Sequence, residues 1–114
     1  MKRLLPLLLL PLLSCSQYIK PRVDITIANK SHEVIRNIEL DYPGGSYGRG
    51  MLAVYDSDHH TVEIDQPNCL LTLKFDDTKG DSHSRKDMNL GAKCPSKISV
   101  VIDAQLAISA EPTQ

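Results

Sequence analysis

The sequence has few aromatic residues and no tryptophan. Its 114 residues include one Phe and four Tyr. A chain of this length has room for one domain. Because aromatic side chains supply so little volume, the core of that domain has to be built mainly from Val, Ile and Leu.

An excess of positive charge is also missing. Thirteen Lys and Arg stand against 14 Asp and Glu, and without Lys2 and Arg3 the balance of side-chain charges is −3. Basic residues do not cluster elsewhere, since the pair Arg85 and Lys86 is followed directly by Asp87. Phosphate binding needs clustered Lys and Arg, so this composition argues against nucleic acid as a partner.

The longest apolar run, residues 4–13, is too short to cross a bilayer as a helix, which needs about 20 residues. Lys2 and Arg3 precede the run, and Leu12-Leu13-Ser14-Cys15 closes it. A positive start and a short apolar core are typical of a signal peptide. The closing residues resemble the lipobox of bacterial lipoproteins, in which a Leu, an aliphatic or small residue and a small residue precede a Cys.

That resemblance covers about an eighth of the chain and implies cleavage before Cys15, which would then carry the lipid. Several acyl chains, at about 0.8 kcal/mol per buried methylene, anchor a protein durably. Ser16 stands where an Asp would resemble an inner-membrane retention signal. We therefore expect an outer-membrane lipoprotein facing the periplasm, with the inner membrane and the cell surface as alternatives.

The chain has no Cys-x-x-Cys motif, and Cys69 and Cys94 are the cysteines left beside Cys15. An even pair in an oxidising compartment predicts a disulfide. Residues 68–76 are typical of a strand, and residues 82–90 of its return after a turn. This hairpin brings Cys94 back to Cys69, and the bond would stabilise the domain by roughly 3 kcal/mol.

No apolar pattern of helical period extends over three turns after the leader. Instead, about seven short segments are typical of strands, and several of them alternate apolar and polar residues: 23–28, 34–42, 51–55, 61–65, 68–76, 82–90 and 98–102. Extension of the last segment through residue 108 is an alternative. Such segments, separated by turn signals, predict an all-β domain. We expect a small antiparallel β-sandwich of immunoglobulin-like architecture, with a small closed barrel as the alternative.

The expected organisation is a signal peptide over residues 1–14, a lipidated tether over 15–21, the β-sandwich over 22–109 and a flexible tail over 110–114. Within the second strand segment, Ile35 is out of step with the alternation that follows it. This irregularity predicts a β-bulge near Arg36.

Residues 43–50 form the one glycine-rich segment, which we expect to be a long loop between strands. It lacks the Gly-Lys-Ser/Thr ending and the following helix of a phosphate-binding loop. Tyr47 and Arg49 would then lie exposed at its tip. Both residue types are enriched at protein interfaces, so we expect them to contact a partner protein.

Asp56, Asp58, His59 and His60 form the densest group of metal-ligating residue types. The group lacks the Gly and Glu positions of an EF-hand, and adjacent histidines on an extended chain point to opposite faces. A solvated turn is the favoured interpretation. A metal site built on Asp56, Asp58 and His59 is the alternative.

A second acidic group, with Asp76, Asp77, Asp81 and His83, lies at the predicted hairpin turn. Asp and Gly are the residues that turns demand, so turn chemistry accounts for it.

Motifs of catalysis are missing as well. The chain has no Gly-x-Ser-x-Gly elbow, and a disulfide would leave no free cysteine in the domain. We therefore expect no enzymatic activity and no cofactor. The leading hypothesis is a lipoprotein that binds another envelope protein, either as an immunity protein or as an accessory subunit of an envelope machine. The alternative is a periplasmic domain that binds a metal or small ligand through residues 56–60.

Overall fold

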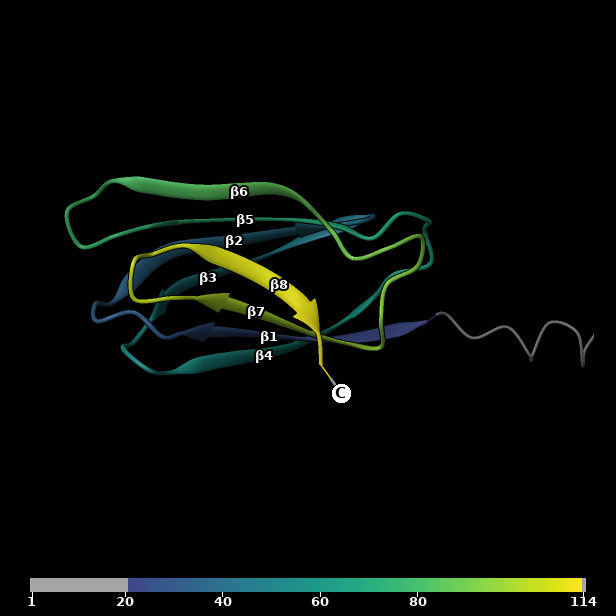
Figure 1. Cartoon of the computed structure of the whole chain (residues 1–114), viewed down its shortest axis with the longest axis horizontal. Helices are drawn as coiled ribbons and strands as arrows, with labels where there is room; N and C mark the ends of the chain where they lie inside the picture. Colours follow the sequence, from purple (N-terminus) through teal and green to yellow (C-terminus); the bar gives the residue numbers. More distant parts are fainter. Residues whose placement is uncertain (1–20, 114) are drawn as a thin grey trace, which may run out of the picture.

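The computed structural model describes residues 21–113, which form two stacked four-stranded sheets (Figure 1). The strands are β1 (Arg22–Asn29), β2 (Ile35–Tyr42), β3 (Gly45–Leu52), β4 (Ser57–Glu63), β5 (Leu70–Asp76), β6 (Ser82–Asn89), β7 (Lys97–Ile102) and β8 (Ile108–Pro112). The predicted signal peptide and Cys15 lie outside the described residues.

One sheet has the strand order β4-β1-β7-β8 and the other β3-β2-β5-β6. Neighbouring strands are antiparallel except β1 and β7, which run parallel. This arrangement confirms the all-β sandwich. Residues 21–113 contain no helix, and therefore none that is long and apolar enough to cross a membrane.

The core between the sheets is aliphatic, as the composition predicts. Alternate residues of the central strands are buried, and Phe75 is the single phenylalanine among them. The largest fully buried side chains are Phe75, Ile25, Ile27, Ile35, Leu40, Leu52, Leu71, Leu73, Ile98, Ile102, Val23 and Val100. Burying a Val, Leu or Ile side chain contributes about 1.5–3 kcal/mol, so these strands supply most of the driving force for folding.

The bulge predicted near Arg36 is confirmed. The register between β2 and β5 shifts between Arg36 and Glu39, and Asn37 has a positive φ of 51°. The extra residue restores the phase of the strand, because Ile35 and Ile38 are both buried although they are three positions apart.

The prediction of a long loop over residues 43–50 is wrong. The connection is a tight turn at Pro43 and Gly44, and β3 follows from Gly45, paired along its length with β2. Gly44 supplies the turn with a positive φ of 91°, and at Gly45 a Cβ would lie 2.8 Å from the Tyr42 hydroxyl. Pairing with β2 therefore overrides the low strand propensity of glycine.

Three strand boundaries also need correction. β4 begins at Ser57, so Asp58 and His59 belong to a strand and not to a turn. The last predicted strand is divided into β7 and β8 by a turn. The Asp103 carboxylate closes this turn by accepting hydrogen bonds from the backbone N–H groups of Gln105 (2.8 Å) and Ala107 (3.0 Å). The tail expected from residue 110 starts later, since β8 continues to Pro112.

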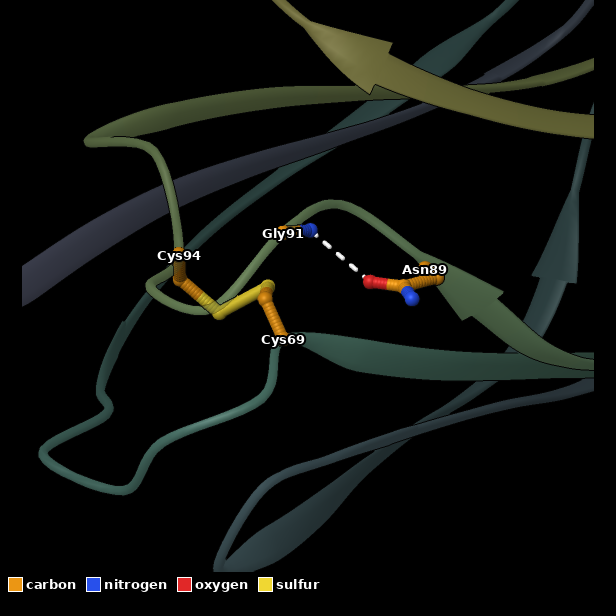
Figure 2. The surroundings of a disulfide bond; sticks show 4 residues. All are labelled: Cys69, Asn89, Gly91 and Cys94. Atoms are coloured by element: carbon orange, nitrogen blue, oxygen red, sulfur yellow. Dashed lines mark hydrogen bonds between the residues drawn. A yellow bond between two sulfur atoms is a disulfide. The ribbon is translucent and has the colours of Figure 1, made fainter.

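The predicted Cys69–Cys94 disulfide is present, with its Cα atoms 4.9 Å apart (Figure 2). Cys69 exchanges backbone hydrogen bonds of 2.8 Å with Leu90 and Gly91, where the chain returns from β6. Asn89 accepts a hydrogen bond from the Gly91 N–H (2.9 Å). The predicted hairpin therefore brings the two cysteines together.

Candidate functional site

The two ends of the sandwich differ in what they carry. The proximal end, as we call it, holds Pro21 and the disulfide, which lie around one shallow hollow. The distal end holds the four connections at residues 30–34, 53–56, 77–81 and 103–107, which gather at the opposite end of the strands (Figure 1). Loops carried by a rigid scaffold are the usual place for binding residues, so the distal end is the candidate site.

Buried polar side chains hold two of these connections. Asn29 is fully buried and donates hydrogen bonds to the carbonyls of Glu33 (2.9 Å), Leu52 and Ala53 (both 3.2 Å). Ser31, also fully buried, donates to the Asn29 side-chain oxygen (2.6 Å). These bonds join the β1–β2 connection to the β3–β4 connection and satisfy backbone groups that water cannot reach.

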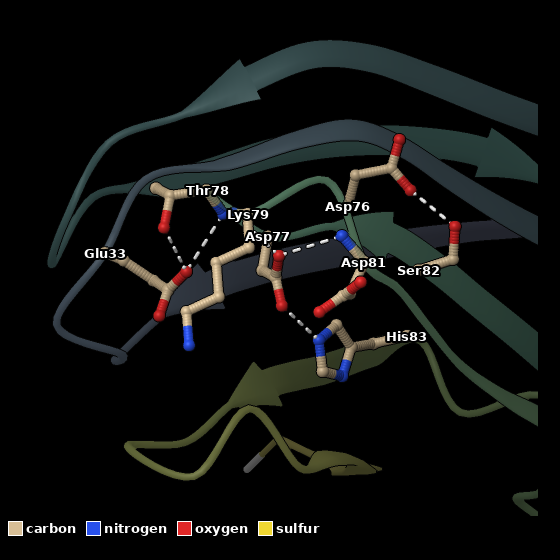
Figure 3. Close-up of polar contacts among 8 residues, drawn as sticks. All are labelled: Glu33, Asp76, Asp77, Thr78, Lys79, Asp81, Ser82 and His83. Atoms are coloured by element: carbon tan, nitrogen blue, oxygen red, sulfur yellow. Dashed lines mark hydrogen bonds and ion pairs between the residues drawn. The ribbon is translucent and has the colours of Figure 1, made fainter.

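Glu33 joins the β1–β2 connection to the β5–β6 turn (Figure 3). Its carboxylate accepts hydrogen bonds from the Thr78 N–H (3.0 Å) and the Thr78 hydroxyl (2.9 Å). These bonds, the backbone one first, lower the pKa of Glu33 below its ordinary value. The carboxylate is thus stabilised in its charged form on the surface of the distal end.

Asp77 organises the β5–β6 turn itself (Figure 3). One carboxylate oxygen accepts from the N–H groups of Lys79 (2.9 Å) and Asp81 (3.0 Å), and the other from His83 Nε2 (2.8 Å). The hydrogen bond from His83 is the main cause that lowers the pKa of Asp77. The His83 ring stacks on Phe75, with 5.2 Å between ring centroids. The predicted turn chemistry is confirmed.

Tyr55 is the most exposed large hydrophobic residue described, with 66% of its surface accessible. It lies in the β3–β4 connection with a positive φ of 59°, and a 2.8 Å hydrogen bond joins its hydroxyl to His32 Nδ1. Val54, which directly precedes it, and Met51, near the end of β3, are also exposed. An aromatic residue in the left-handed region is uncommon and costs about 1–3 kcal/mol, which the surrounding structure has to offset.

A cleft of about 570 Å³ opens between β6 and the β7–β8 connection. We call it the Arg85 cleft, and it is lined by Ser82, His83, Ser84, Arg85, Leu106, Ala107 and Ile108. Arg85 crosses from one sheet to the other, donating a 2.7 Å hydrogen bond to the Ile108 carbonyl. The volume of the Arg85 cleft falls in the range of ligand sites in proteins.

Tyr47 and Arg49 do not lie at a loop tip. Both occupy inward positions of the edge strand β3, opposite Leu40 and Ile38, and both contact Asp58 of the other sheet. Arg49 donates to Asp58 at 2.6 Å, and the Tyr47 hydroxyl donates to the second Asp58 oxygen. That hydrogen bond and burial raise the pKa of Tyr47. Polar residues turned inward on edge strands close this side of the sandwich.

The three candidate metal ligands are not brought together. Asp56 accepts the Ser57 N–H (2.8 Å), Asp58 points at Arg49, and His59 is on the other face of β4, joined to the Thr26 hydroxyl at 2.9 Å. Within residues 21–113, no group of three or more His, Cys, Asp or Glu side chains could hold a metal ion.

Sequence reasoning missed Glu33, Tyr55 and Arg85 as surface features of one end. The sequence pattern places Tyr55 at the end of the predicted strand 51–55 and Arg85 within the predicted return strand 82–90. A partial signal existed in the three polar turn regions around residues 30, 56 and 79. Their gathering at one end depends on strand order, which no local pattern contains.

The comparisons with known proteins bear on the fold alone. The chain matches no protein-family model and no curated protein. Among solved structures, it is similar to the NMR structure of a protein from Eubacterium rectale, with a TM-score of 0.56 and 15% sequence identity. The match covers 83% of this chain and 91% of that chain, so the β-sandwich as a whole is shared.

Proposed function

We propose that this protein is a lipid-anchored envelope protein that binds another envelope protein through its distal end. The observation that carries the proposal is the exposed Tyr55, held by His32 at the end of the sandwich farthest from Pro21. Pro21 is the described residue nearest in sequence to Cys15, the proposed lipidation site.

The geometry separates the proposed anchor from the candidate surface. The strands are mostly seven or eight residues long, and a strand rises about 3.3 Å per residue, so the two ends lie roughly 25 Å apart. An anchor that precedes β1 directs the proximal end to the membrane. The distal end then projects toward the periplasm in the proposed outer-membrane location.

The chemistry of the distal end suits a protein partner. Aromatic residues and Met are enriched at interfaces, and Tyr is among the residues that contribute most to binding energy. Because the Tyr55 hydroxyl is already bonded to His32, ordering this side chain on binding costs little additional entropy. An immunity protein and an accessory subunit of an envelope machine would both use such a surface, and a neighbouring toxin gene would favour the first.

Position-specific crosslinking tests the binding surface. A photo-reactive phenylalanine analogue at position 55 should give a discrete crosslinked product in intact cells. The matched control is the same analogue at Leu70, an exposed apolar residue at the start of β5 near the disulfide. Equal products from both positions, or none from position 55, would contradict binding through the distal end.

The anchor has its own test. Cys15→Ala should abolish metabolic labelling with palmitate and release the protein from the membrane fraction, because the acyl chains provide the membrane affinity. The unaltered protein should fractionate with the outer membrane in an enteric-type host. A C15A protein that still takes up label would disprove lipidation at this residue.

A further inference from the structure

The two open sides of the sandwich are closed to different degrees. On the β3–β4 side, Tyr47 and Arg49 reach across to Asp58, and the Tyr47 ring also stacks on His60 with centroids 3.8 Å apart. On the β6–β8 side, the Arg85–Ile108 hydrogen bond is the one bridge described, and the Arg85 cleft lies beside it. The second side therefore has room for a ligand.

Arg85 also differs from Arg49 in its partners. Arg49 is paired with the Asp58 carboxylate, whereas none of the ion pairs described within residues 21–113 involves Arg85. A guanidinium has five N–H donors in a planar fork, and the Ile108 carbonyl accepts from one of them. A carboxylate is the group that matches this fork in charge and geometry.

The walls of the Arg85 cleft suit an extended peptide. β6 and β8 are both edge strands, so each has an unpaired backbone edge on this side. Ser82 to Arg85 supply four residues of wall, a length of roughly 10 Å, which matches three or four residues of an added strand. Leu106 and Ala107 provide a small apolar surface opposite, whereas the Ile108 side chain is buried in the core.

We propose that the Arg85 cleft binds the carboxyl-terminal end of an extended peptide from the partner protein. Arg85 receives the terminal carboxylate, the backbone adds to the edge of β6, and the last side chain contacts Leu106 and Ala107. Strand addition and capture of a terminal carboxylate are both established modes of peptide recognition. The inference deepens the proposed function and rests on it for the source of the peptide.

Peptide pools test the ligand class with the full chain purified in mild detergent. A pool of random pentapeptides with free carboxylates is compared with the same pool amidated at its carboxyl terminus, and retention on the immobilised protein is measured. We expect the free-acid pool to be retained about 10- to 100-fold better, with apolar last residues enriched, because a charge-assisted bidentate contact is lost on amidation. Equal retention of the two pools, or retention of neither, overturns the proposal.

Two variants locate the site. Arg85→Gln should abolish the preference for the free acid, and Ala107→Asp should do the same by placing a carboxylate beside an intact Arg85. Ala107 is exposed, so this second variant keeps the core unchanged. Arg36→Gln, at an exposed arginine of β2 outside the cleft, is the matched control and should bind as the unaltered protein does. A preference that survives both cleft variants refutes the assignment.

The outcome is separable from that of the proposed function. Loss of crosslinking at position 55 with intact peptide binding would reject the distal-end interface and retain the cleft. Crosslinking at position 55 without discrimination between the two pools would reject the cleft alone.

Discussion

At the scale of single residues, Asp77 makes the stability of the domain depend on pH. Its carboxylate accepts hydrogen bonds from two backbone N–H groups and from the His83 ring, and its pKa is lowered from the ordinary 3.8. A group with a lowered pKa stabilises the folded state above its unfolded pKa, and the contribution is lost as pH falls through the folded value. This contribution is therefore complete above about pH 4 and disappears in more acidic solution.

We expect Asp77→Asn to lower the free energy of unfolding at pH 7 and to flatten its decline below about pH 4. Asn keeps an oxygen for the N–H groups of Lys79 and Asp81 but loses the charge that faces His83. Urea denaturation at a series of pH values measures both effects. Asp81→Asn is the control, since no side-chain hydrogen bond of Asp81 is described in the same turn; an equal response from the control would contradict the role of Asp77.

Asp58 is the second residue whose role can be tested singly. It is 8% exposed and accepts hydrogen bonds from Arg49 and Tyr47. Asp58→Ala removes the acceptor of both donors on the β3–β4 side of the sandwich, so we expect the free energy of unfolding to fall by about 2 kcal/mol in chemical denaturation. Glu63→Ala, at an exposed position of the same strand, should change stability by less than about 0.5 kcal/mol. Equal effects would show that the contacts of Asp58 contribute nothing specific.

At the scale of elements, β3 contains glycines that its own geometry does not require. Neither Gly48 nor Gly50 has a positive φ, and a Cβ added at Gly50 would meet no atom within 4 Å. Glycine weakens a strand by about 0.5–1 kcal/mol, because its backbone loses more freedom on folding. These positions are therefore open to residues with higher strand propensity.

We expect Gly50→Thr to stabilise the domain by about 0.5–1 kcal/mol. Gly80→Thr is the matched control: a Cβ there also meets open space, but Gly80 has a φ of +89° in the β5–β6 turn. A β-branched residue is strained in that region, so the control should destabilise by about 1 kcal/mol. Thermal denaturation of the two variants separates backbone conformation from side-chain space, and stabilisation by both would refute the argument.

At the scale of the whole molecule, the disulfide joins the start of β5 to the β6–β7 connection across 25 residues. Closing a loop of that length stabilises by roughly 3–4 kcal/mol in the chain-entropy model. We expect Cys94→Ser or reduction to cost the full chain roughly 2–5 kcal/mol in urea denaturation. Mass spectrometry of the unreduced digest should recover the linked peptides, and two alkylatable thiols under oxidising conditions would disprove the bond.

The candidate site was less predictable than the fold. The sequence predicts a glycine-rich loop at Tyr47 and Arg49, because local propensity disfavours a strand there. Pairing with β2 placed them in β3, and stacking of the sheets turned them toward Asp58. Asp58 was expected in a solvated turn for a similar reason. A charge pattern read along the chain contains no information on the opposite sheet, which supplied the partners of these residues.

By itself, the sequence determined the fold class, the aliphatic core, the bulge near Arg36 and the partners of the disulfide. The fold class, the core and the bulge follow from the two-residue period of a strand, which one face of burial imposes. The disulfide follows from an even pair of cysteines at the open end of a predicted hairpin. Only the tertiary structure decided which turns gather at the distal end, which side of the sandwich is closed by Asp58, and which side leaves Arg85 beside a cleft. Those outcomes depend on strand order and on contacts between the sheets, and such long-range pairings leave no local periodicity in the chain.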